Sequence, residues 1–167
     1  MAEKFNASEI EEKGKRFGLD GFNSICIAQV ASTILSLLGV KNESGKENEN
    51  STLNVAKMAE PIESVLTLAK EKFADSSSIG KNASICDRVF MYNPDAIAYW
   101  IFGKYYKKYF SKIDEVSDLV LPMLSVFPPK TPVCFASMYS GLMPEIHGIR
   151  KYEKPVLKCN TIFDNLI

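Results

Sequence analysis

The hydrophobic and polar positions of this 167-residue chain follow a helical period in the N-terminal half. Residues 23–38 are apolar on most sides and the run stops at Gly39, which predicts a helix packed between other elements. Apolar residues at three- and four-residue steps over 53–73 predict a second helix, within which Pro61 starts a new segment. A short charged helix is expected at 8–16. This half therefore reads as helical.

The pattern changes at Cys86, where apolar and polar residues begin to alternate. The alternation over 87–92 predicts a strand, and the apolar run 118–127 predicts a second one. Helices are predicted between and after them, over 96–110 and for about ten residues from Pro132. Strand, helix, strand and helix in succession are typical of a parallel sheet. We therefore expect an α/β fold, with a mostly parallel sheet flanked by helices.

Composition suggests a division of the chain into two parts. A helical N-terminal segment is expected over 1–85, with a polar loop at 41–52 that contains no apolar residue, and the α/β domain over 86–167. A linker rich in Ser, Gly and Asn, at 74–84, marks the boundary. Two strands are few for a sheet, and the last predicted helix stops in mid-pattern. We therefore expect that the α/β domain is truncated.

Overall composition, 46% hydrophobic and 24% charged, is that of an ordinary globular protein. Lys and Arg number 20, as do Asp and Glu, and this zero net charge argues against a nucleic-acid polymer as partner. It leaves room for a small phosphorylated ligand.

The sequence shows no secretory signal and no apolar run that would span a bilayer, so we expect a cytoplasmic protein with no membrane partner. The four widely spaced cysteines are expected to be buried free thiols. Nothing in the pattern indicates an oligomeric state.

Two residues that follow the predicted strands carry candidate chemistry. Asp95 ends an Asn-Pro-Asp turn, where its carboxylate could bind a metal or transfer a proton, or could cap the next helix. Thr131 precedes a helix opened by Pro132 and could likewise be only an N-cap. A hydroxyl at a helix N-terminus also lies where phosphate is favoured, and it can become a nucleophile. Lys130 could steady a phosphate or be a solvated loop lysine.

His147 is the single histidine of the chain. A hydrolase that used a histidine as general base would have to use this one. The surrounding Pro-Glu-Ile-His-Gly-Ile favours the alternative that His147 holds a turn through hydrogen bonds. Local pattern alone therefore indicates a structural histidine.

Taken together, these stretches resemble a known family. P-P-K-T-P-V-C-F-A-S-M-Y-S-G-L-M-P-E-I-H-G-I (128–149) resembles the nucleophile segment of the alkaline phosphatase superfamily, closest to the type I phosphodiesterase / nucleotide pyrophosphatase branch. In that branch a Thr-containing loop is followed by T-G-x-x-P-E-x-H-G-I, here S-G-L-M-P-E-I-H-G-I. Upstream, C-D-R-V-F-M-Y-N-P-D-A-I (86–97) resembles the first strand, whose terminal Asp binds metal.

The resemblance implies an alkaline-phosphatase-like fold and metal-dependent hydrolysis of phosphoric esters or pyrophosphates. Thr131 would be the nucleophile and Asp95 a ligand in a site of two divalent metal ions, with zinc expected and Thr131 beside them. The partner would be a phosphate ester or a nucleotide-like small molecule. His147 would bind no metal. The C-x-P-x-R motif of the related sulfatases is absent from the sequence, which disfavours sulfate esters.

The sequence also departs from the family pattern. Cys134 stands where that branch often has an Asn that holds a phosphate oxygen, and Ser140 stands where Thr is usual. The family draws its other Asp and His ligands from segments beyond the equivalent of Ile167. A truncated, non-catalytic fragment or interaction module of the same fold is therefore the alternative. A cofactor-independent mutase relative is disfavoured, because its nucleophile is usually Ser.

Overall fold

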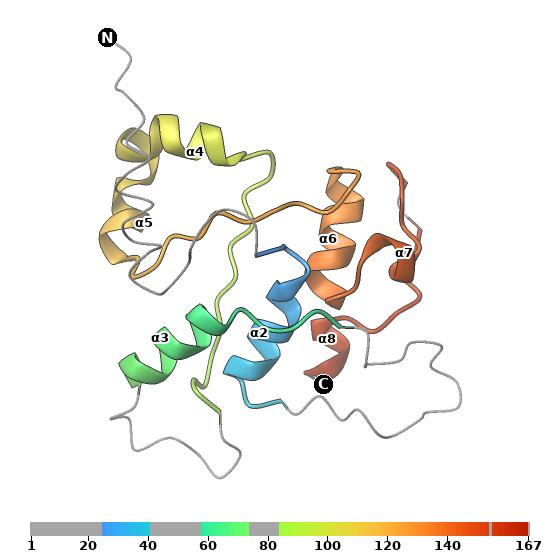
Figure 1. The fold of residues 1–167 in the computed structure, drawn as a ribbon, viewed down its shortest axis with the longest axis horizontal. Coiled ribbons are helices and arrows are strands. Elements are labelled where there is room, and N and C mark those ends of the chain that lie inside the picture. Colours follow the sequence, from blue (N-terminus) through green and yellow to red (C-terminus); the bar gives the residue numbers. More distant parts are fainter. Residues whose placement is uncertain (1–24, 41–57, 74–83, 154, 167) are drawn as a thin grey trace.

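The computed structural model describes residues 25–40, 58–73, 84–153 and 155–166 (Figure 1). These ranges contain the helices α2 (Gln29–Leu37), α3 (Glu63–Phe73), α4 (Tyr99–Tyr105), α5 (Ser111–Val116), α6 (Thr131–Ser140), α7 (Pro144–His147) and α8 (Ile162–Asn165), and a π-helical turn, η2 (Tyr106–Phe110). The predicted helix at 8–16 and the polar loop at 41–52 lie outside the described residues, as does most of the linker at 74–84.

Helix α2 is the central element, and its polar side chains connect it to its neighbours. The Thr33 hydroxyl donates to the Gln29 carbonyl (2.6 Å) and accepts the Ile62 N–H (2.9 Å). The Gln29 amide donates to the Glu60 carbonyl (3.1 Å), and its oxygen accepts the Cys26 N–H (2.8 Å). Polar groups in a mostly apolar helix are thus satisfied, as buried polar groups must be. They join α2 to the segment that leads into α3.

The predicted parallel sheet is wrong for the part of the chain that the structure describes. Residues 118–127 contribute only an isolated parallel bridge, in which the Leu124 N–H donates to the Ile25 carbonyl (2.7 Å) and the Ile27 N–H donates to the Leu124 carbonyl (3.0 Å). Residues 87–92 run as an extended segment outside any strand (Figure 1). A strand is stabilised by hydrogen bonds to neighbouring strands. Alternation reports which side chains are buried, but it does not show that a neighbour exists.

The same bridge explains why α2 is shorter than the predicted helix 23–38. The Ile25 carbonyl and the Ile27 N–H are bonded to Leu124, and the Cys26 carbonyl accepts the Gln29 N–H in a turn (3.0 Å). The helix therefore begins at Gln29.

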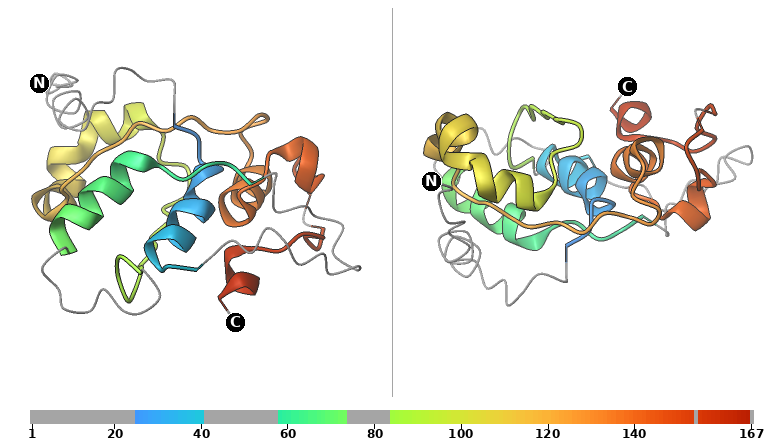
Figure 2. Two further views of the ribbon diagram at one scale, coloured as in Figure 1. Left: turned by 60° about the horizontal axis from the view of Figure 1, so that its bottom comes forward. Right: turned by 90° about the horizontal axis from the view of Figure 1, so that it is seen from above.

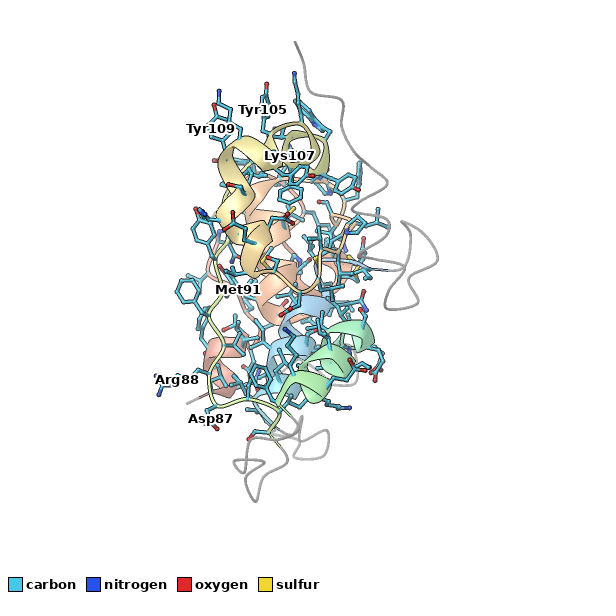
Figure 3. All side chains as sticks on the ribbon, turned by 90° about the vertical axis from the view of Figure 1, so that its left-hand side faces the viewer. Asp87, Arg88, Met91, Tyr105, Lys107 and Tyr109 are labelled. Atoms are coloured by element: carbon cyan, nitrogen blue, oxygen red, sulfur yellow. The ribbon has the colours of Figure 1, made fainter. Side chains whose placement is uncertain are left out.

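The extended segment keeps the two-residue period that led to the strand prediction. Val89 and Met91 pack against the hydrophobic core, whereas Phe90 and Tyr92 on the other side are 91% and 68% exposed. Figure 3 shows Met91 on this segment, at one side of the molecule. Val89 and Met91 are half-buried, so the segment has one side against the core and one side exposed to solvent.

The predicted helix 96–110 is part of a longer helical arm formed by α4, η2 and α5. The arm begins at Tyr99 and continues past the predicted end at residue 110 to Val116. The Phe102 ring centroid lies 5.9 Å from that of Tyr106 and 5.4 Å from that of Phe110. These three aromatic rings therefore lie together on the less exposed side of the arm. Figures 1 and 2 show the arm on the side of the molecule opposite α6, α7 and α8.

Two clusters of buried side chains hold the remaining elements together. The first cluster joins α2 to α8, and its buried members are Ala31, Ile34, Leu35 and Ile162. The second cluster joins α6 to the segments on either side of it, and its buried members are Val126, Val133, Ala136 and Ile149. Helix α2 packs against α3, α6 and α8. Helix α3 begins two residues after Pro61, which confirms that a new helical segment starts there, and α6 confirms the predicted ten-residue helix. Residues 58–62, which were also predicted to be helical, lie outside any helix, and residues 53–57 lie outside the described part of the chain. None of the helices in the described ranges is long and apolar enough to cross a lipid bilayer.

Candidate active site

The candidate site is built around the N-terminus of α6. Thr131 is the first residue of the helix, and Lys130, in an extended conformation, is the N-cap residue. The Lys130 carbonyl accepts the Cys134 N–H (2.9 Å), and no side chain caps the helix. Pro132 has no backbone N–H, and it fits here because the N–H groups in the first turn of a helix have no partners within the helix. The N-cap alternative for Thr131 is therefore wrong, and the hydroxyl is available for another contact.

That contact is with Asp95. The Thr131 hydroxyl donates to an Asp95 carboxylate oxygen at 3.4 Å, across 36 residues of sequence. Such a distance is long for a hydrogen bond between oxygen atoms, so the contact is weak. Asp95 is exposed and does not cap α4, which begins at Tyr99 after Ala98. The capping alternative for Asp95 is wrong as well. The structure therefore brings together the two residues that the sequence singled out.

A hydrogen bond that sequence analysis missed attaches the Asp95 turn to α6. The Asn93 amide donates to the Tyr139 hydroxyl at 3.0 Å. Tyr139 is itself held between aromatic rings: Phe135 is stacked on it at 5.6 Å and Phe163 is tilted against it at 5.4 Å. The sequence marked Asn93 only as part of a turn, because no local pattern indicates a partner so distant along the chain.

The residue after Asp95 has an unusual backbone conformation. Ala96 has a φ of +58°, in the left-handed region that side chains other than glycine rarely adopt. A residue held there costs roughly 1–3 kcal/mol, and such residues often occur at functional sites. The chain thus turns sharply at Asp95, and this turn exposes the carboxylate beside the α6 N-terminus.

Lys130 and Cys134 flank the pair on the α6 side. The Lys130 side chain is exposed, and its backbone N–H donates to the Pro128 carbonyl (2.8 Å). The Cys134 thiol lies 3.3 Å from the Ser125 hydroxyl and is half-buried. Cys159 is buried, and Cys26 and Cys86 are half-buried; all four cysteines are free thiols, as predicted, but only one is fully buried. A phosphate-binding role for Lys130 stays a prediction.

His147 is a turn-holding residue, as its surroundings in the sequence indicated. Its Nδ1 accepts the Ile149 N–H (3.1 Å), so the proton of the neutral ring is on Nε2. Nε2 therefore donates to the buried Ser137 hydroxyl (2.9 Å). Burial lowers the pKa of His147 below its ordinary value of 6.5, and the Glu145 charge offsets part of that effect.

This tautomer also argues against a serine-hydrolase role for the Ser137–His147 pair. A serine hydrolase needs an unprotonated histidine nitrogen facing the serine, so that the ring can take the hydroxyl proton. In the Ser137–His147 pair that nitrogen carries the proton, and both side chains are buried. The pair is therefore a structural connection between α6 and α7.

The donor groups at the α6 N-terminus are too few for a metal centre. In the described ranges, no group of three or more His, Cys, Asp or Glu side chains is arranged to hold a metal ion. Asp95 and Thr131 offer a carboxylate and a hydroxyl oxygen, whereas zinc in catalytic sites takes three protein ligands. These residues alone do not fit a two-metal centre.

Comparison with known proteins identifies a family that part of the chain matches. Residues 104–156 match the family model described as Type I phosphodiesterase / nucleotide pyrophosphatase, which lies within the alkaline phosphatase superfamily. This confirms the resemblance predicted from the sequence. The family comprises hydrolases that act on phosphate-ester and nucleotide substrates and depend on divalent metal ions. The matched segment contains Thr131 and ends upstream of α8, and Asp95 precedes it. No curated protein and no solved structure is detectably similar to the chain.

Proposed function

We propose that the chain carries the nucleophile segment of a phosphoric-ester hydrolase of the phosphodiesterase / nucleotide pyrophosphatase family, with Thr131 as nucleophile. The Thr131 oxygen would lose its proton to solvent and attack phosphorus, and the bond from phosphorus to the leaving oxygen would break, with the leaving group taking up a proton from water. The threonine would carry the remaining phosphate or phosphate ester until water releases it. The observation that supports this most is the 3.4 Å contact between Thr131 and Asp95.

The position of Thr131 on α6 agrees with this role. The N-terminus of a helix has a positive potential and unpaired N–H groups, both of which favour a phosphate. Pro132 removes one of those donors, and the exposed Lys130 supplies a positive charge next to it. We assign Lys130 a secondary role in binding substrate phosphate.

We propose that Asp95 is a metal ligand, as its place after the family's first strand implies. A carboxylate is a suitable ligand for a divalent ion, and zinc is the ion that we expect. Two oxygens are fewer than such an ion takes from a protein, so Asp95 and Thr131 would form only part of the centre. A cytoplasmic location remains a prediction from the sequence.

Turnover of a simple phosphodiester tests this proposal. The full chain, supplied with zinc, is incubated with bis(para-nitrophenyl) phosphate, and release of nitrophenol is followed. Thr131→Ala should reduce turnover by at least about a hundredfold, because nothing replaces the attacking oxygen. Thr131→Ser should retain part of it, and Thr67→Ala, at an exposed threonine on α3, should leave it unchanged. Undiminished turnover by a folded Thr131→Ala variant would refute the assignment.

The second candidate is a non-catalytic module of the same family. Two observations favour it: the described residues do not form a complete metal site, and Phe90 and Tyr92 are strongly exposed. A protein that retains no stoichiometric zinc after dialysis and releases no nitrophenol would support the module. Zinc retention that Asp95→Asn weakens, together with turnover, would support the hydrolase.

A further inference from the structure

The helical arm of α4, η2 and α5 carries an apolar stripe on its solvent side. Tyr105, Tyr109, Ile113 and Val116 follow one another at steps of four, four and three residues, which places them near one face of the arm. All four are exposed, from 37% for Tyr105 to 80% for Val116. The Tyr105 and Tyr109 ring centroids are 6.0 Å apart, so these rings are neighbours. Figure 3 shows both tyrosines at the outer end of the molecule.

A line of lysines runs beside the apolar stripe. Lys104, Lys108 and Lys112 are spaced four residues apart, Lys107 lies between them in sequence, and all four are exposed. The sequence contains no Asp or Glu from 96 to 113, so this part of the arm is strongly basic although the whole chain has no net charge. Lys112 pairs with Glu115. Asp114 and Glu115 lie in α5, so the positive charge is concentrated in α4 and η2, beside the tyrosine end of the exposed apolar stripe.

Trp100, the only tryptophan of the chain, is 65% exposed on α4. Tryptophan and tyrosine concentrate at membrane–water interfaces, and lysines beside an apolar helix face attract anionic lipid headgroups. We propose that the arm formed by α4, η2 and α5 docks on the surface of an anionic membrane. The apolar stripe would enter the headgroup region, and the lysines would contact phosphate or carboxylate groups of the lipids.

The ring contacts favour a membrane over a single-stranded nucleic acid. Lys104 Nζ lies 5.2 Å from the Tyr105 ring centroid, and Lys108 Nζ lies 5.1 Å from that of Tyr109. Each lysine covers one face of its tyrosine, and the two rings are tilted by 54°, so a base could stack on at most one face of each ring and not on both rings in parallel. Ile113 and Val116 cannot stack on bases at all, but they can be buried among lipid chains.

This proposal differs from the sequence-based expectation of no membrane partner, which rested on the lack of a spanning segment. A helix that lies in the interface needs only an apolar face and a charged flank. The proposal is also independent of the hydrolase assignment, because it involves neither Thr131 nor Asp95.

Trp100 provides a direct probe in the unmodified chain. The full chain is mixed with vesicles of phosphatidylcholine alone or of equal parts phosphatidylcholine and phosphatidylserine, and tryptophan emission and co-sedimentation are recorded. We expect a shift of emission to shorter wavelength and co-sedimentation with the phosphatidylserine vesicles only. Added salt should weaken both, because surface charge interactions are screened.

Variants then locate the surface. Each lysine near an anionic surface contributes about a fivefold gain in binding, so Lys104→Gln combined with Lys108→Gln should lower the partition coefficient about 30-fold. Tyr109→Ser combined with Val116→Ser should also lower it. Lys70→Gln, at an exposed lysine on α3, is the matched control and should bind like the wild type. Circular dichroism checks that the variants remain folded.

The proposal is overturned if the wild-type chain ignores phosphatidylserine vesicles, or if folded Lys104→Gln/Lys108→Gln protein binds them as tightly as the control. Binding of a labelled single-stranded oligonucleotide without binding of vesicles would assign the surface to nucleic acid and overturn it too.

Discussion

At the scale of single residues, the contact between Thr131 and Asp95 depends on side chains that the sequence marked and on others that it did not. Both residues could be found from their positions after predicted strands and from the family motif. Asn93 and Tyr139 could not be paired in advance, because a hydrogen bond across 46 residues leaves no local pattern. The assignment of His147 as a turn-holding residue could be made from its neighbours, but its tautomer needed the structure.

The left-handed conformation of Ala96 predicts that glycine is favoured there. Ala96→Gly should raise the free energy of unfolding by about 0.5–1 kcal/mol, because glycine adopts a positive φ without steric cost. Ala69→Gly, within α3, should instead lower it by about 0.5–1 kcal/mol, because glycine is unfavourable inside a helix. Urea unfolding of both variants gives the comparison. Equal destabilisation of the two would contradict the Ala96 backbone conformation.

The buried neutral ring of His147 predicts that stability falls in acid. In the unfolded chain the histidine gains a proton near its ordinary pKa of 6.5, whereas burial keeps the folded pKa lower. Below about pH 6.5 the unfolded state therefore binds more protons than the folded state. The stabilisation that the neutral His147 ring provides is complete above its unfolded pKa and is lost as pH falls through its folded pKa.

Urea unfolding between about pH 8 and about pH 5 measures this effect. His147→Gln should be less stable by about 1–3 kcal/mol at the higher pH, because the Ile149 N–H and the Ser137 hydroxyl lose buried partners. Its stability should also change less over this pH range than that of the wild type. An identical pH dependence in the variant would show that another group titrates.

At the scale of elements, helices were predicted well and strands were not. The repeat of apolar residues and the position of Pro61 or Pro132 are local signals, and they are enough to place α3 and α6. A strand also depends on a neighbour elsewhere in the chain. The alternation over 87–92 predicted a strand, yet the described residues place no strand beside this segment, and only its half-buried Val89 and Met91 contact the core. The arm ran on beyond residue 110 because α5 contains no helix-breaking residue.

The end of α6 provides a matched pair of glycines. Gly141 has a φ of +73°, and a Cβ there would lie 2.4 Å from Met58 Cγ, whereas Gly148, after α7, has a φ of +82° and nothing within 4 Å. Gly148→Ala should therefore show the conformational cost alone, about 1 kcal/mol. Gly141→Ala adds a clash and should lower stability by about 2 kcal/mol or more. Thermal unfolding compares them, and a smaller loss for Gly141→Ala would contradict the packing of Met58 on α6.

At the scale of the whole molecule, two separate surfaces emerge. One, at the α6 N-terminus, brings Thr131 and Asp95 together and lies partly in the segment that matches a hydrolase family. The other, on the arm of α4, η2 and α5, presents lysines and exposed aromatic rings. Net charge could not reveal the second, because acidic residues elsewhere cancel the lysines in the total. The spatial separation of charge became visible only with the fold.

Mass spectrometry after rapid acid quenching tests most directly whether Thr131 attacks the phosphorus atom. The full chain with zinc is mixed with bis(para-nitrophenyl) phosphate, quenched within one turnover and digested. We expect a para-nitrophenyl phosphate ester on the peptide that contains Thr131, because only one of the two nitrophenol groups has left, and no such adduct on that peptide from the Thr131→Ala variant. Release of nitrophenol without an adduct, an adduct on another residue, or no reaction at all would contradict it.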